Sequence, residues 1–351
     1  MGADDNFFDV GGVSLDAVQL FSQIERLTGR ELPLTAISDS PTIRELTQVA
    51  NAATPRSSPL PVLLRPGDTS MPLFIVHGFG GSVIELRPLA RALSTEAAVY
   101  GIRVSGFEPG EPVYDRVEDM ARIYLEAIKV LQPHGPYLLS GYSFGGLVAY
   151  EIARLLAGDD RVALLALLDT TVHERHWPRA AWLEHFRRRL AHHLGALRGQ
   201  GPSAIAAGIG RSIRAMVERL RRASEAAAPA DPDGQRLPES VRRLRAADLA
   251  AFSVYRPSAS DLPMTVLRSD LRESTLCDPR RVWESLSPSM TLIDVPGNHM
   301  TMIRLPFLAT LAERLSACVD AARANGVGRT LSRQGRPSGP ASTARDEGWR
   351  P

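Results

Sequence analysis

The chain has 351 residues, 44% of them hydrophobic, which is enough for one large domain of about 250 residues and a smaller unit. Its 41 lysines and arginines nearly balance its 39 aspartates and glutamates, so the net charge of +2 gives no reason to expect nucleic acid or a membrane as partner. Two distant cysteines argue against a disulfide framework, the N-terminus MGADDNFF is not a signal peptide, and no apolar run is long enough to span a bilayer. We therefore expect a cytoplasmic protein.

The first predicted unit covers residues 1–53 and contains two amphipathic helices. Apolar residues follow helical spacing from Leu15 to Leu27, and Ser40 as N-cap with Pro41 as first residue indicates a second helix. Ahead of the first helix, two glycines in DVGGVSL bring Ser14 to a helix N-terminus, where backbone N–H groups favour a phosphate ester. From the residues alone, Ser14 is either an N-cap or the bearer of a phosphate group.

The motif DNFFDVGGVSL, followed by LPL and PTIREL, resembles the second half of a peptidyl carrier domain from nonribosomal peptide synthetases. The resemblance implies that Ser14 carries 4′-phosphopantetheine, attached by a phosphopantetheinyl transferase. Val13 stands where such carriers usually have His or Asp, and the first carrier helix, which should precede Asp4, is missing. We therefore expect the C-terminal piece of a longer synthetase, whose partners are upstream synthetase modules or a carrier-bound peptidyl chain.

Residues 54–70 are rich in Pro, Ser, Thr and Ala and are predicted to form a linker, with a short strand at Val62–Leu64 as the one exception. From residue 71 to residue 320, apolar strand-like runs alternate with helical stretches, as is typical of a parallel sheet covered by helices on both faces. Strands are predicted at Leu73–Val76, Ala98–Val104, Tyr137–Leu139, Val162–Leu168, Met264–Leu267 and Met290–Val295, and helices at Leu86–Leu93, Val117–Leu131 and Leu305–Cys318.

An Ala- and Arg-rich segment at about residues 171–250 interrupts this alternation. Its helical stretches are interpreted as a lid over the carboxyl ends of the strands, where α/β enzymes build their pockets. The arginines are expected on solvated helix faces, and a role in guiding an acidic carrier or substrate is the alternative. The histidines of the segment lack cysteine or carboxylate partners, so we expect no metal site. Residues 321–351 show no apolar period and are predicted to form a disordered tail.

The sequence SGYSFGG contains a nucleophile-elbow pattern, with Gly141, Ser143 and Gly145 in G-x-S-x-G spacing. An apolar strand precedes it, and a helix is predicted to begin near Leu147. A sharp turn between strand and helix lifts the serine hydroxyl clear of the sheet, and the glycines leave room for that turn. The turn also places the Phe144 N–H at a helix N-terminus, where it can point at a developing oxyanion.

A serine nucleophile needs a base, an acid that holds the base, and a second oxyanion donor. His299 suits the base, because it lies in the glycine-containing loop VPGNHMTMI after the last strand. Asp169 and Asp270 each follow a strand, and the residues alone leave both open as the acid. Phe79, in the glycine-rich loop after the first buried strand, is predicted to supply the second backbone N–H.

The segments FIVHGFGGSV, GPYLLSGYSFGGLVAYEIARLL and DVPGNHMTMI together resemble the terminal thioesterase domain of nonribosomal peptide synthetases, which has the α/β-hydrolase fold. The resemblance runs from about Pro72 to Val319 and is weakest in the lid. It implies that Ser143 accepts an acyl or peptidyl chain, which then leaves by hydrolysis or macrocyclisation, and it favours Asp169 as the acid. The alternatives are a proofreading thioesterase, or a carrier module with phosphopantetheine on Ser14 and an inactive large domain.

Overall fold

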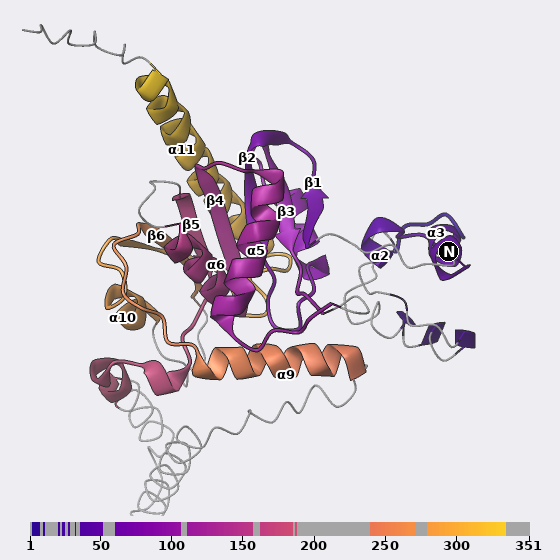
Figure 1. The fold of residues 1–351 in the computed structure, drawn as a ribbon, viewed down its shortest axis with the longest axis horizontal. Coiled ribbons are helices and arrows are strands. Elements are labelled where there is room, and N and C mark those ends of the chain that lie inside the picture. Colours follow the sequence, from indigo (N-terminus) through magenta and orange to yellow (C-terminus); the bar gives the residue numbers. More distant parts are fainter. Residues whose placement is uncertain are drawn as a thin grey trace, which may run out of the picture.

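A central sheet of seven strands organises the fold, shown in Figure 1 from a computed structural model. The structure describes residues 2–7, 10, 20–21, 23–24, 27–28, 32, 36–51, 60–106, 111–156, 162–184, 187, 239–270 and 279–334. The strand order is β1-β3-β2-β4-β5-β6-β7. The strands are β1 (Pro61–Arg65), β2 (Asp68–Val76), β3 (Ala97–Ile102), β4 (Tyr137–Tyr142), β5 (Val162–Leu168), β6 (Met264–Ser269) and β7 (Met290–Val295).

All neighbouring strands run parallel except β1, which pairs antiparallel with β3 at the sheet edge. Because side chains alternate along a strand, Leu73 and Phe74 of β2 enter different hydrophobic cores. The core on one face includes α5 (Val117–Leu131) and α6 (Phe144–Leu155), and the other includes α4 (Arg87–Ala92) and α11 (Leu308–Gln334). Helices thus cover both faces (Figure 1), which confirms the predicted α/β-hydrolase fold.

Two short helices belong to the N-terminal segment, α2 (Ala36–Asp39) and α3 (Ile43–Asn51). Thr42 and Glu45 form a capping box, because the Thr42 N–H donates to Glu45 Oε2 at 3.1 Å and the Glu45 N–H donates to Thr42 Oγ1 at 3.2 Å. Helix α3 therefore begins after Thr42, later than Ser40 and Pro41 predicted. The predicted helix from Leu15 to Leu27 lies largely outside the described residues.

The N-terminal segment and the large domain share one small hydrophobic cluster. Ile84, in the 3₁₀ helix η1 (Ile84–Leu86), is buried together with Phe21, Ile37 and Leu46. These apolar contacts join the segment to the large domain directly after its glycine-rich loop.

Strand β1 confirms the short strand predicted at Val62–Leu64 and extends it by one residue at each end. The start of β2 also lies within residues 54–70, where a linker was predicted, so the linker prediction is wrong there. Pro61 is tolerated as the first residue of an edge strand, where a missing N–H breaks no ladder. The Arg65 guanidinium donates to the Ala97 carbonyl at 2.7 Å and so ties β1 to the sheet. Residues 52–59 lie outside the described part of the chain.

Helix α11 continues to Gln334, into the predicted disordered tail. Val319 and Ala322 still pack in the hydrophobic core, beyond the predicted end at Cys318. Once such a helix is nucleated, each further residue adds a hydrogen bond at little cost, so the helix extends past its packed part. Residues 335–351 lie outside the described residues.

The ends of the predicted lid are described by the 3₁₀ helix η2 (Glu174–His176) and by α9 (Glu239–Val254). In Figure 1, α9 crosses below the ends of α5 and α6. The helices predicted between residues 188 and 238 lie outside the described residues. A further short helix, α10 (Pro279–Glu284), had no counterpart in the sequence prediction. Among the helices described, none is both long and apolar enough to cross a bilayer.

Candidate active site

Ser143 sits in the tight turn between β4 and α6, with φ +55° and ψ −119°. A non-glycine residue rarely adopts this conformation, and such strain is typical of a serine nucleophile elbow. The flanking glycines are required by space, because a Cβ on Gly141 would overlap the Gly145 carbonyl and a Cβ on Gly145 would overlap the His77 carbonyl. Helix α6 begins at Phe144, directly after the serine and earlier than Leu147 predicted.

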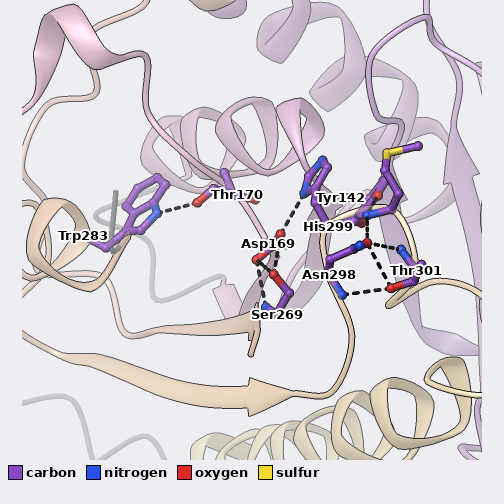
Figure 2. A network of polar contacts seen from close by, with 9 residues as sticks. Tyr142, Asp169, Thr170, Ser269, Trp283, Asn298, His299 and Thr301 are labelled. Atoms are coloured by element: carbon purple, nitrogen blue, oxygen red, sulfur yellow. Dashed lines mark hydrogen bonds and ion pairs between the residues drawn. The ribbon is translucent and has the colours of Figure 1, made fainter. Parts of the chain in front are cut away.

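His299 is held in the loop after β7 by contacts to its ring and its backbone. Its Nδ1 lies 2.8 Å from Asp169 Oδ2. The Tyr142 hydroxyl donates to the His299 carbonyl at 2.6 Å, and the two rings stack with centroids 5.3 Å apart. The loop is closed by the Asn298 side chain, which accepts the Thr301 N–H at 2.9 Å (Figure 2). The residue before Ser143 therefore contacts the histidine directly.

Asp169 directly follows β5, has a positive φ of 45°, and accepts several hydrogen bonds. It accepts hydrogen bonds from the Ser269 N–H at 2.9 Å and the Ser269 hydroxyl at 3.1 Å, besides the contact with His299 (Figure 2). Burial acts to raise the pKa of Asp169, but the bonds from His299 and Ser269 outweigh it and hold the pKa below its usual value. The carboxylate therefore stays ionised and can orient the imidazole.

Asp270, the alternative acid, contacts the histidine loop at a different place. Its Oδ1 accepts the Gly297 N–H at 3.0 Å, and its side chain is exposed. Gly297 has φ +97°, so this bond stabilises a turn that favours glycine. The structure thus brings Asp169 to the ring of His299 and Asp270 to the backbone before it.

The predicted oxyanion donors, Phe79 and Phe144, lie next to each other. Their rings stack with centroids 5.0 Å apart, and Phe252 of α9 packs edge-on against Phe79 at 5.5 Å. Neither Phe79 N–H nor Phe144 N–H donates a hydrogen bond to another described residue. The loop after β2 and the first residue of α6 therefore each present one N–H group without a partner among the described residues, and an oxyanion hole is built from two such donors.

The sequence analysis missed three residues that contact this site, Tyr142, Ser269 and Asp248. Asp248 could have been noticed in the sequence, because it shares the buried face of α9 with Leu244 and Ala251 at helical spacing. A lone acid on an apolar helix face calls for a buried partner. Tyr142 and Ser269 left no such signal, since their roles depend on which strands become neighbours.

Other predicted features are described only in part. Ser14 and Val13 lie outside the described residues. Within the described ranges, no group of three or more His, Cys, Asp or Glu side chains could hold a metal ion. A cavity of about 530 Å³ lies between the start of the lid and α10, lined by Trp177, Arg256 and Leu286 among others. Its lining does not include Ser143, Asp169 or His299.

Two family comparisons match separate parts of the chain. Residues 71–318 match the thioesterase domain family, and residues 1–50 match the family described as phosphopantetheine attachment site. The second match confirms the prediction that the N-terminal segment is a carrier segment with a phosphopantetheine attachment site.

Relatives of known name agree with both matches. The chain is 35% identical over 181 residues to an atromentin synthetase of Serpula lacrymans var. lacrymans, covering 49% of this chain and 19% of that protein. It is 29% identical over 338 residues to a protein of Paxillus involutus named inactive atromentin synthetase. This match covers 92% of this chain and 35% of that protein. A solved structure of a four-domain nonribosomal peptide synthetase bound to AMP and glycine is 26% identical to this chain, with a TM-score of 0.58. The match covers 90% of this chain and 24% of that one.

The chain therefore spans only between 19% and 35% of the length of these relatives. The thioesterase match, by contrast, covers more than half of the chain itself, from β2 to α11. This chain belongs to the thioesterase domain family, and its thioesterase domain is preceded by a carrier segment of the nonribosomal peptide synthetase type.

Proposed function

We propose that this chain releases an acyl or peptidyl group from a phosphopantetheine thioester through an ester on Ser143. The observation that carries the proposal is the 2.8 Å contact between His299 Nδ1 and Asp169 Oδ2, in a loop bonded to the residue next to Ser143. These two bonds bring the ends of β4, β5 and β7 together, which supports an arrangement of Ser143, His299 and Asp169 as nucleophile, base and acid.

The chemistry follows from the hydrogen-bond directions. Because the His299 Nδ1–H donates to Asp169, Nε2 has the free lone pair and takes the proton of the Ser143 hydroxyl. The serine oxygen then bonds to the thioester carbonyl carbon, and the negative oxygen formed is stabilised by the N–H groups of Phe79 and Phe144. When the carbon–sulfur bond breaks, the leaving thiolate takes the proton from His299.

The second half of the reaction removes the acyl group from the serine. His299 takes a proton from water, or from an amine or hydroxyl of the acyl chain itself, and that oxygen or nitrogen attacks the ester carbonyl. The Ser143 oxygen leaves and regains a proton from His299. Water gives a free acid, and an internal nucleophile gives a ring.

We infer that Ser14 is the attachment point of 4′-phosphopantetheine in the carrier segment. The sequence GGVSL and the carrier-family match over residues 1–50 support this assignment. Incubation with coenzyme A and a phosphopantetheinyl transferase should add the mass of one phosphopantetheinyl group to the chain. Ser14→Ala should add none, and loading of that variant would contradict the assignment.

The test of the release activity compares wild type, Ser143→Ala and Ser143→Cys with an acyl-pantetheine thioester as substrate. We expect Ser143→Ala to lower turnover by about 10⁴–10⁶-fold, because the triad acts as a unit. Ser143→Cys should retain acylation, since a thiol is also a nucleophile. Turnover of Ser143→Ala within tenfold of wild type would contradict the proposal.

The alternative of an inactive large domain is tested separately, because two similar proteins of Paxillus involutus are named inactive atromentin synthetases. A fluorophosphonate probe reacts with a serine only when base and oxyanion donors activate it. We expect stoichiometric labelling of Ser143 in the wild type and none in Ser143→Ala. An unlabelled wild type would favour a carrier module with an inactive thioesterase domain.

A further inference from the structure

Helix α9 at the end of the lid packs against the loop that contains Phe79. Three of its residues, Arg245, Asp248 and Phe252, follow the three- and four-residue spacing of one helix face. The Gly80 N–H donates to Asp248 Oδ2 at 2.8 Å, and Phe252 packs edge-on against the Phe79 ring. A Cβ on Gly80 would lie 3.2 Å from the Arg245 side chain. One helix face therefore covers the loop.

The loop itself is a tight turn in which Phe79 is the second residue. The Gly81 N–H donates to the Gly78 carbonyl at 3.2 Å, and Gly80 has φ +88°, as a type II turn requires at its third residue. His77 Nδ1 donates to the same Gly78 carbonyl at 2.6 Å. This carbonyl shares its peptide plane with the Phe79 N–H. One side of Phe79 is thus fixed by His77.

The other side of Phe79 is fixed by Asp248, because the Gly80 N–H belongs to the next peptide plane. Two held planes leave the residue between them little rotation about φ and ψ. The direction of the Phe79 N–H therefore depends on both bonds. Without Asp248, the Phe79–Gly80 peptide could turn, and the turn that aims the Phe79 N–H would loosen.

Asp248 is an unusual group to find in this position. It is completely buried, and its Oδ1 has no hydrogen-bond partner among the described residues. Burial raises the pKa of Asp248 to about 8, against the opposing effects of the Gly80 N–H and Arg245. A leucine would fill the site at lower cost, so stability alone does not explain a carboxyl group here.

We propose that Asp248 is a positioning residue that aims the Phe79 N–H at the oxyanion by holding the Gly80 N–H from the lid helix. This inference rests on the proposed function, because it presumes that Phe79 is an oxyanion donor. It extends that function by giving α9 of the lid a role in positioning an oxyanion donor.

The test uses the full chain with Asp248→Leu, Asp248→Asn and, as a control on the exposed face of α9, Arg243→Ala. Steady-state turnover of an acyl-pantetheine thioester, as kcat and KM, and the thermal midpoint of unfolding are measured for each. Asp248→Leu should keep or raise the unfolding midpoint. Its kcat should fall about 10–100-fold while KM stays within threefold of wild type. This loss is smaller than the rate loss of about 10²–10³-fold expected when a whole oxyanion donor is removed. Asp248→Asn keeps an acceptor oxygen and should stay within threefold of wild type, as should Arg243→Ala.

A purely structural role predicts the opposite pattern, with activity following stability across the variants. If Asp248→Leu retains kcat within threefold, the inference is wrong. Should that variant fail to unfold cooperatively, Asp248→Ala replaces it under the same limits, since a smaller side chain cannot clash. An inactive wild type would instead contradict the proposed function, so the two failures are distinguishable.

Discussion

At the scale of single residues, the two aspartates that follow neighbouring strands have different contacts and should differ in effect. Asp169 meets the His299 ring, whereas Asp270 meets the Gly297 N–H. We expect Asp169→Asn to lower kcat by about 10⁴-fold, because an amide at this position favours the wrong histidine tautomer. Asp270→Asn keeps an acceptor for Gly297 and should lose less than tenfold. A larger loss in Asp270→Asn than in Asp169→Asn would reverse the assignment.

Asp248 should also make stability depend on pH in a predictable direction. Its pKa rises from 3.8 to about 8 on folding, mainly through burial. The folded state therefore favours the protonated form, and this contribution to stability is complete below pH 3.8 and is lost as pH rises towards 8. The other ionisable groups that act on Asp248 are Arg245 on the same helix and Tyr124 of α5, whose hydroxyl is hydrogen-bonded to His77.

The measurement is urea unfolding of wild type and Asp248→Asn from pH 4 to pH 9. The variant has no ionisable group there, so its advantage over wild type should grow by at most about 1.4 kcal/mol per pH unit up to pH 8 and then level off. Burial also raises the pKa of Glu85, to about 7, but that effect is present in both proteins and cancels. A constant difference across this range would contradict the raised pKa.

At the scale of elements, one hydrogen bond joins the nucleophile elbow to the loop of the base. The Tyr142 hydroxyl at the end of β4 donates to the His299 carbonyl. Tyr142→Phe removes this bond and keeps the stacked ring, so we expect a loss of about 1 kcal/mol in stability. Since the loop also positions the base, kcat should fall about three- to tenfold.

Tyr137→Phe is the matched control for this prediction. Its hydroxyl, on the same strand, donates to the Gln132 carbonyl at 3.1 Å and lies at the opposite end of β4 from the elbow. Both variants should lose similar stability, while only Tyr142→Phe should lower kcat. Equal kcat values in the two variants would show that the bond to His299 has no part in catalysis.

At the scale of the whole molecule, the sequence predicts the parts of the fold that form uninterrupted apolar patterns. The bounds of β5, β7 and α5 agree with the prediction, because each is a single apolar or amphipathic run between breaks. Strand β1 was predicted only as the short run Val62–Leu64, because an edge strand is only half-buried and tolerates Pro61 and Arg65, so its ends have the composition of a linker. The prediction ended α11 too early, at Cys318, because the sequence of its last turns has no apolar period.

The candidate site follows the same division. Ser143 and His299 could be predicted because each lies in a short glycine-containing motif after an apolar strand. The residues alone left Asp169 and Asp270 open as the acid, because they follow the adjacent strands β5 and β6 and differ only in their contacts to the loop of His299. Asp248 could not be assigned a role, because its partner Gly80 lies 168 positions away in the chain.

The central claim is that the acyl group passes through an ester on Ser143, and the most direct measurement is its detection by mass spectrometry. The chain is mixed with an acyl-pantetheine thioester, quenched in acid within the first turnover, digested and mapped. We predict the mass of one acyl group on the peptide that contains Ser143, and none in Ser143→Ala. Rapid thioester cleavage with no acyl group on that peptide at any time would contradict the account.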